Sequence, residues 1–182
     1  TTSTGLWNST IQAVAGSQED ASASLTDLVV DGMEITQSVQ DLNNSVPLVA
    51  GKRTFVRVYA HSTTGIHPAT ATLKADIGLL SQNLLPIKPG GPLINVRPFS
   101  HRLLPSHAFL FELPSWAVVA GGLTLTATVN PDLRWRPRNP EEVSYANNTL
   151  TKTVTFDLVP TLHLVIAEQP YSFNNQFFSV RP

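Results

Sequence analysis

Alternation of apolar and polar residues with a period of two constrains the fold of this chain more than any other feature. In residues 123–129 (LTLTATV), apolar residues occupy every odd position and threonines every even position. Residues 149–158 repeat the pattern, with Thr149, Thr151, Thr153 and Thr155 on one side and Leu150, Val154, Phe156 and Leu158 on the other. Successive side chains of a strand point to opposite faces, so both segments predict strands with one face in a core and one in water.

Further strands are predicted at 52–60, 70–79, 28–37, 93–99, 107–113 and 161–168, with glycine or proline between most of them. No segment after residue 21 has the 3.6-residue period of a long helix. Seven or eight strands without intervening helices predict an all-β fold, an antiparallel β-sandwich, with a closed barrel as the alternative. The predicted core residues are Val56, Val58, Leu73, Ala75, Ile77, Leu123, Leu125, Ala127, Val129, Val154 and Phe156.

The composition of the chain argues against nucleic acid and membrane as binding partners. Of the 182 residues 14% are charged, against about 25% in an average soluble domain, and the net charge is −1. A chain with this charge has no electrostatic footprint for nucleic acid. No apolar run approaches the roughly 18 residues of a membrane helix, so membrane insertion is not expected. The absence of cysteine excludes disulfides and thiol catalysis, and it is compatible with a secreted or cell-surface location.

The chain divides into three parts. Residues 1–27 are rich in small and polar residues and are predicted to be an N-terminal linker or arm. Residues 28–159 form the predicted sandwich. Residues 160–182 are predicted to supply an extra strand and a connection to a following domain, because Pro160 interrupts the alternation. The aromatic residues of this tail are too numerous for an ordinary solvated linker: Tyr171, Phe173, Phe177 and Phe178.

Several segments carry a family resemblance. They are residues 27–30 (DLVV), 51–58 (GKRTFVRV), 121–131 (GGLTLTATVNP), the Glu141–Glu142 pair and residues 147–149 (NNT). Over about residues 27–159 the chain resembles the bacterial cell-adhesion-related (CARDB) family of immunoglobulin-like modules. The resemblance implies an immunoglobulin-like antiparallel β-sandwich of seven to eight strands. It also implies a non-catalytic structural or adhesion module of an exported multidomain bacterial protein. The loop after Pro131 and the stretch 32–50 are longer than the family pattern.

No motif in the chain requires catalysis. The histidine pairs His61/His67 and His101/His107 are each separated by a predicted turn, and no HExxH or GxSxG motif is present. Acidic residues are too scattered to nominate a carboxylate pair. We therefore expect no enzymatic activity, no cofactor and no metal.

One loop carries the candidate binding residues. Arg134, Trp135, Arg136 and Arg138 form a cationic and aromatic cluster that suits an anion or a sugar ring. In the alternative reading, Trp135 covers an end of the sandwich and the arginines pair with acidic neighbours. A calcium site is a further alternative, with oxygen ligands from Asp132, Asn139, Glu141 and Glu142.

The expected partners are neighbouring domains of the same polypeptide, and a protein or glycan at the cell surface is a further candidate. Two alternative functions stay open: a carbohydrate-binding module, and an accessory or propeptide-like domain of an exported hydrolase such as a metallopeptidase.

Overall fold

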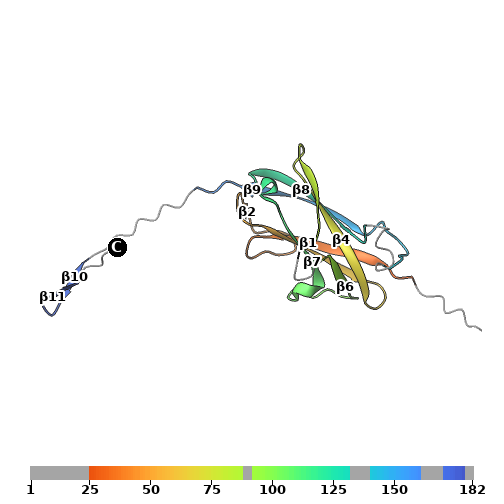
Figure 1. Ribbon diagram of the computed structural model, residues 1–182, viewed down its shortest axis with the longest axis horizontal. Coiled ribbons are helices and arrows are strands. Elements are labelled where there is room, and N and C mark those ends of the chain that lie inside the picture. Colours follow the sequence, from red (N-terminus) through yellow and green to blue (C-terminus); the bar gives the residue numbers. More distant parts are fainter. Residues whose placement is uncertain (1–24, 88–91, 132–139, 161–169, 179–182) are drawn as a thin grey trace, which may run out of the picture.

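The computed structural model describes residues 25–87, 92–131, 140–160 and 170–178, and this part of the chain is all-β. It contains no α-helix; two single 3₁₀ turns, η1 (Pro105–His107) and η2 (Ser115–Ala117), interrupt the strands. Consequently, none of the described residues belongs to a helix that could cross a membrane. Two layers of strands face each other in Figure 1.

The first sheet has three antiparallel strands in the order β1-β3-β7. These strands are β1 (Leu28–Thr36), β3 (Phe55–Ser62) and β7 (Ala108–Glu112). On β3, Val56 and Val58 point to the core and are buried, as the period of two predicts.

The second sheet has the order β2-β9-β8-β4-β5. Its strands are β2 (Leu48–Val49), β4 (His67–Asp76), β5 (Ser81–Leu84), β8 (Gly121–Val129) and β9 (Thr149–Asp157). All its pairs are antiparallel except β2 with β9, which is parallel. β6 (Leu93–Val96) pairs with the first half of β4, and the residue after it, Arg97, bridges to β3. β6 therefore links the two sheets.

Threonines line the outer face of the second sheet. The register of β8 with β9 places three threonine pairs opposite each other, with Oγ1–Oγ1 distances of 3.0–3.3 Å. The pairs are Thr124–Thr153, Thr126–Thr151 and Thr128–Thr149. Cross-strand threonine pairs stabilise a sheet, so this polar face contributes to pairing while it stays in contact with water.

One hydrophobic core lies between the sheets and draws side chains from both. Nine of the eleven predicted core residues are buried; Ile77 and Val154 are half-buried and pack against the core. The predicted facing of the central strands is therefore confirmed. The largest fully buried side chains that were not among the predicted core residues belong to β1 and β7: Leu28, Met33, Ile35, Phe109 and Phe111.

Two predicted strand ends are wrong. Leu79 and Leu158 were expected to extend apolar faces, but their exposed fractions are 99% and 81%. β4 ends at Asp76, whose Oδ1 accepts a hydrogen bond of 2.7 Å from the backbone N–H of Gly78, where φ is +89°. This turn sends the chain into β5 before Leu79. β9 likewise ends at Asp157. The strand predicted over 161–168 falls outside the described residues.

A short hairpin follows near the C-terminus. β10 (Tyr171–Phe173) pairs with β11 (Gln176–Phe178) across a turn in which Asn174 and Asn175 both have positive φ. Two successive positive φ values match the tight turn that suits hairpins. The rings of Tyr171 and Phe178 stack with centroids 5.0 Å apart. All six strand residues are exposed.

Candidate functional site

The predicted binding loop falls mostly outside the described residues. This applies to Arg134, Trp135, Arg136 and Arg138, and to Asp132 and Asn139 of the calcium alternative. Of that alternative, the structure describes the two glutamates: Glu141 is exposed and Glu142 is buried. The neighbouring acids thus have different surroundings, and Glu142 defines a site of its own.

Glu142 lies where β1 begins, β8 ends and β9 begins. Its Oε2 accepts a hydrogen bond of 2.7 Å from the backbone N–H of Leu28. Its Oε1 accepts hydrogen bonds from the side-chain amides of Asn148, at 2.9 Å, and of Asn130. One buried carboxylate therefore joins the first strand of one sheet to the residue that follows β8 and the residue that precedes β9. Its partners in the described part of the chain are neutral N–H donors.

Two asparagines extend this network. Asn147 donates from Nδ2 to Asp27 Oδ2 at 2.7 Å, and its backbone carbonyl accepts from Val30 at 3.1 Å. Asn148 donates from Nδ2 to the carbonyl of Val129 at 3.1 Å as well as to Glu142. We call the set Thr26, Asp27, Asn130, Glu142, Asn147 and Asn148 the end cluster.

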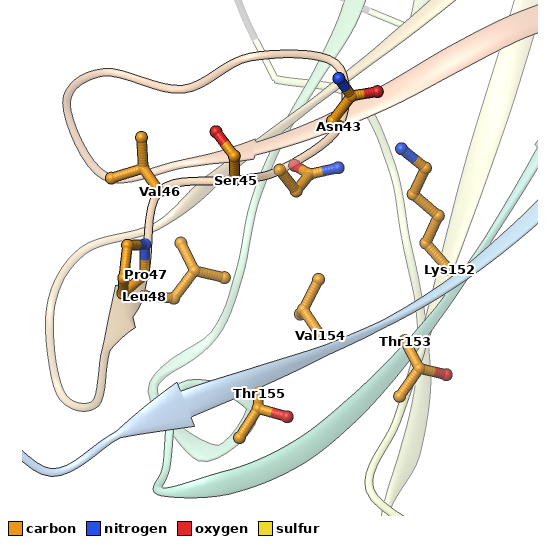
Figure 2. Close-up of a pocket in the computed structure, with 10 residues that line it drawn as sticks. Asn43, Ser45, Val46, Pro47, Leu48, Lys152, Thr153, Val154 and Thr155 are labelled. Atoms are coloured by element: carbon orange, nitrogen blue, oxygen red, sulfur yellow. The ribbon is translucent and has the colours of Figure 1, made fainter.

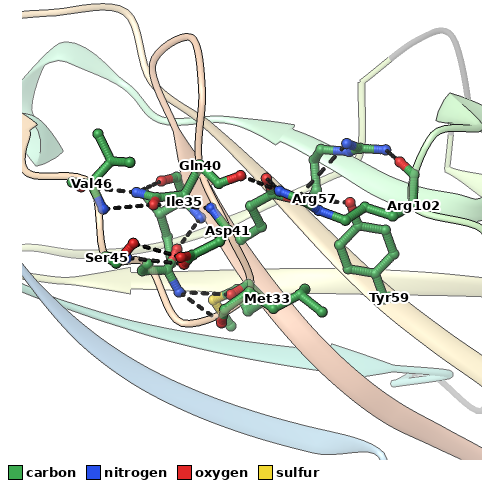
Figure 3. Close-up of polar contacts among 12 residues, drawn as sticks. Met33, Ile35, Gln40, Asp41, Ser45, Val46, Arg57, Tyr59 and Arg102 are labelled. Carbon is green, nitrogen blue, oxygen red and sulfur yellow. Dashed lines mark hydrogen bonds and ion pairs between the residues drawn. The ribbon is translucent and has the colours of Figure 1, made fainter.

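The long β1–β2 connection covers the free edge of β1. Asn44 accepts a hydrogen bond of 2.6 Å at Oδ1 from the N–H of Ile35 and donates from Nδ2 to the carbonyl of Met33 at 2.9 Å. Gln40 donates to the carbonyl of Ile35 at 3.1 Å. These contacts, drawn in Figure 3, give the edge of β1 the partners that another strand would supply. Exposed strand edges promote aggregation, so this covering is protective.

Hydrogen bonds within the β1–β2 loop fix its conformation. Ser45 donates from its backbone N–H and its hydroxyl to the two carboxylate oxygens of Asp41, at 3.0 and 2.5 Å. These hydrogen bonds lower the pKa of Asp41. Gln40 Oε1 accepts from the N–H of Val46 at 2.9 Å. The loop therefore presents Asn44 and Gln40 in a defined geometry.

A cavity of about 310 Å³ separates this loop from β9 (Figure 2). Residues 43–48 form one wall and residues 152–155 the other. Beside it, Lys152 Nζ donates to the backbone carbonyls of Leu42 and Met33, at 2.8 and 3.1 Å. An inward-pointing charge on an edge strand opposes the addition of another strand. The cavity therefore lies beside a protected edge of β9, and the charge of Lys152 disfavours binding of a peptide strand there.

A buried ion cluster lies on the outer face of the first sheet (Figure 3). Glu34 is 3% exposed; it accepts hydrogen bonds from Arg102, at 2.6 Å, and from the Tyr59 hydroxyl, at 2.9 Å. Arg57 lies 3.9 Å away. Burial acts to raise the pKa of Glu34, but the hydrogen bonds and the arginine charges together lower it. Burial raises the pKa of Tyr59 to about 12. With these shifts, Glu34 is ionised and Tyr59 keeps its proton near neutral pH.

Of the described histidines, only His101 and His107 contact each other, and the others have separate partners. His61 pairs with Asp31 at 2.6 Å, whereas His107 Nδ1 accepts from the backbone N–H of His101 at 3.2 Å. His67 Nε2 lies 3.2 Å from the Thr64 hydroxyl. Among the described residues, no three or more His, Cys, Asp or Glu side chains converge in a geometry that could hold a metal.

Fold and site together define an all-β protein with antiparallel sheets over one core, whose organised polar groups mostly serve strand edges and strand ends. Comparison of the chain with protein-family models, with curated proteins and with solved structures finds no significant match.

Sequence reasoning missed Gln40, Asn44 and Lys152 as organising residues. Lys152 carried a visible signal, since it interrupts the apolar face of its strand between Leu150 and Val154. Gln40 and Asn44 carried none, because their partners on β1 depend on how the loop folds back.

Proposed function

We propose that the two sheets form an immunoglobulin-like sandwich. In such folds one sheet contains strands A, B and E, and the other contains C, F and G, with C′ added beside C in some types. The order β1-β3-β7 corresponds to A-B-E, and β5-β4-β8-β9 corresponds to C′-C-F-G. The connections β3–β4 and β7–β8 cross between the sheets, as B–C and E–F do. This agreement in strand order supports the proposal without any sequence match.

We infer further that the chain is a non-catalytic structural or adhesion module of an exported multidomain bacterial protein, and that it supports a neighbouring domain. The hairpin β10–β11 carries this inference. Four of its six strand residues are aromatic and all six are exposed. An isolated two-stranded hairpin is marginally stable in water, and a cluster of exposed aromatics is typical of an interaction surface. A following domain of the same polypeptide would bury these rings.

The remaining chemistry agrees with this role. The acid and phenol of the buried ion cluster are held in fixed protonation states, and the large polar face is built from paired threonines. An accessory domain of an exported hydrolase would use the same hairpin, so that alternative is a special case of the proposal. The carbohydrate-binding alternative rests on Trp135, outside the described residues; loss of a glycan-array signal in Trp135→Ala would favour it.

The experiment compares hydrogen exchange in the isolated chain with exchange in the longer polypeptide that its gene encodes. We expect the amides of residues 171–178 to exchange quickly in the isolated chain and to gain protection in the longer protein. Amides of β8, already paired on both sides, serve as the control and should exchange equally in both. A gene that encodes no neighbouring domain, or equal exchange of residues 171–178 in the two proteins, would refute the proposal.

A further inference from the structure

Strand β5 forms an open edge of the second sheet. Among the described residues, β4 is the only strand that pairs with it. Other edges are covered: Asn44 bonds the backbone of β1, and the side chain of Gln37 bonds both the N–H and the carbonyl of Val49 in β2. On β7, the carbonyl of Leu110 accepts a hydrogen bond of 2.7 Å from the N–H of Ile87. An open edge presents unpaired N–H and C=O groups that can pair with another chain.

The turn before β5 shows which backbone groups of this strand face outward. Ile77 donates from its N–H to the carbonyl of Leu80 at 3.0 Å, so these two residues form a hydrogen-bonded pair at the start of the β4–β5 hairpin. Opposite residues of an antiparallel pair alternate between hydrogen-bonded and non-hydrogen-bonded pairs. Gln82 therefore bonds to β4, whereas Ser81 and Asn83 direct their N–H and C=O groups away from β4.

The order of residue types around this edge is the same in both directions. Residues 79–85 are LLSQNLL, so two leucines stand on each side of a polar triplet centred on Gln82, and none of these residues is charged. The exposed fractions of Leu79, Leu80 and Leu85 are 99%, 52% and 68%. This edge therefore lacks the charges by which natural edge strands avoid pairing, and it is complementary to a second copy of itself.

We propose that β5 pairs antiparallel with β5 of a second copy of this chain, about a twofold axis at Gln82. In this register Ser81 lies opposite Asn83 of the partner subunit. Both residues direct their N–H and C=O groups into the interface, so each such pair forms two hydrogen bonds. A twofold interface uses the same surface on both subunits, and the symmetric order of residues 79–85 meets that requirement. The second sheet then continues from one subunit into the other.

Leucines flank the polar centre of this interface. Leu80 lies opposite Leu84 of the partner subunit, and Leu79, in the turn, lies opposite Leu85 of the partner subunit. A hollow of about 220 Å³ adjoins the edge, lined by residues 80–82 and Trp116. Trp116 is held there because its Nε1 donates to Gln82 at 3.2 Å. Pairing would cover this indole and the exposed leucines. The interface does not use the β10–β11 hairpin, so it is independent of the proposed function.

Sedimentation velocity over a range of concentrations tests the association. We expect a reversible monomer–dimer equilibrium, because one strand pair buries a small area and such interfaces are transient. Asn83→Pro removes an outward N–H and leaves the bonds to β4 in place, so it should abolish the dimer. Leu85→Lys adds a charge at the interface and should abolish it without a proline. Leu158→Lys is the matched control, since Leu158 is an exposed leucine outside β5. Thermal melts check that each variant folds.

Disulfide formation tests the register. The chain has no cysteine, so an introduced one reports alone. Gln82 would face Gln82 of the partner subunit in a non-hydrogen-bonded pair, with Cα atoms about 4.5 Å apart, within reach of a disulfide. Ser81→Cys is the matched control, because Ser81 would face Ser81 of the partner subunit only diagonally, at about 7–8 Å. Under mild oxidation, Gln82→Cys should give a covalent dimer on a non-reducing gel and Ser81→Cys should stay monomeric.

Three results would overturn the proposal. A chain that sediments as a monomer up to its solubility limit would mean that this edge does not pair with a second copy. A dimer that persists in Leu85→Lys but is lost in Phe177→Ser would place the interface on the β10–β11 hairpin. Equal cross-linking of Gln82→Cys and Ser81→Cys would contradict the twofold register.

Discussion

Asn44 shows how a single side chain can take the place of a strand. Its carboxamide presents one acceptor and one donor to the edge of β1, at Ile35 and Met33. Backbone φ at Asn44 is +57°, a conformation that asparagine tolerates better than most residues. The same residue therefore shapes the loop and satisfies the edge that the loop covers.

Replacement of Asn44 by glycine separates these two roles. Glycine accepts positive φ, so Asn44→Gly removes the two edge hydrogen bonds without straining the backbone. We expect a loss of about 1–3 kcal/mol in the free energy of unfolding, measured with urea, and faster hydrogen exchange at the Ile35 amide. Asn43→Gly is the control, because no edge hydrogen bond in the described structure depends on its side chain. Equal effects of the two variants would contradict this account.

Glu34 makes stability depend on pH. Its pKa in the folded protein lies below the ordinary value of 4.5, so its contribution is fully present above that value and is lost as the pH falls through the folded pKa. We expect Glu34→Gln to cost about 1–3 kcal/mol at pH 7 and progressively less below pH 4.5. Denaturant unfolding of both proteins from pH 7 to pH 3 measures the difference. A difference that stays constant across this range would rule out the ionised cluster.

Leu125 and Thr126 test the facing of β8. Leu125 is fully buried, whereas Thr126 lies on the outer face with its hydroxyl 3.0 Å from that of Thr151. Leu125→Ala should lower the free energy of unfolding by about 2–5 kcal/mol, and Thr126→Ala by less than about 1 kcal/mol. Urea unfolding provides both values. Similar losses would mean that the strand faces the other way.

At the scale of elements, the sequence predicts strands best where one face is water and the other is core. β8 and β9 are evident from their threonines, because exposed threonine and buried leucine alternate with the period of the backbone. β1 and β7 are less evident: burial in β1 runs without interruption from Met33 to Ile35, and Ala108 and Phe109 of β7 are buried in succession. A strand covered on both faces has no alternation to read.

The candidate site was less predictable than the strands, for a physical reason. The end cluster joins residues 26–28 to residues 130–148, and the edge covering depends on a loop that folds back over β1. Such contacts arise from tertiary arrangement, and no local period encodes them. The sequence nominates Glu142 as an oxygen ligand, but its burial and its bridge with Thr26 depend on the tertiary fold.

Lys152 protects the edge of β9. Replacing it by methionine keeps a side chain of similar length but removes the inward charge and both hydrogen bonds to the loop. We expect Lys152→Met to self-associate more than the unsubstituted chain as the concentration rises, because an uncharged edge accepts a second strand more readily. Sedimentation velocity measures the association. Lys74→Met is the control, because Lys74 is exposed on a part of β4 that pairs with β5 on one side and β8 on the other. This variant should associate no more than the unsubstituted chain; increased association of both variants would point to general hydrophobicity instead.

At the scale of the whole molecule, the two sheets depend on each other. Each buries one face in the shared core, and three polar groups tie the sheets together at their margins. Glu142 acts at one end, Lys152 at the open side beside β9, and Arg97 at the side of β6. The chain contains no cysteine, so core packing and polar contacts of this kind hold the two sheets together without a disulfide.

The strand order is the central claim, because the proposed fold rests on it. Nuclear Overhauser contacts between backbone protons in solution test it directly. The account predicts cross-strand contacts between Val58 and Phe109 and between Leu73 and Ala127, which join strands far apart in the sequence. It predicts no backbone pairing of β7 with β8, although these strands follow each other in the chain. Pairing of β7 with β8, in the manner of a simple meander, together with loss of the two long-range contacts, would contradict it.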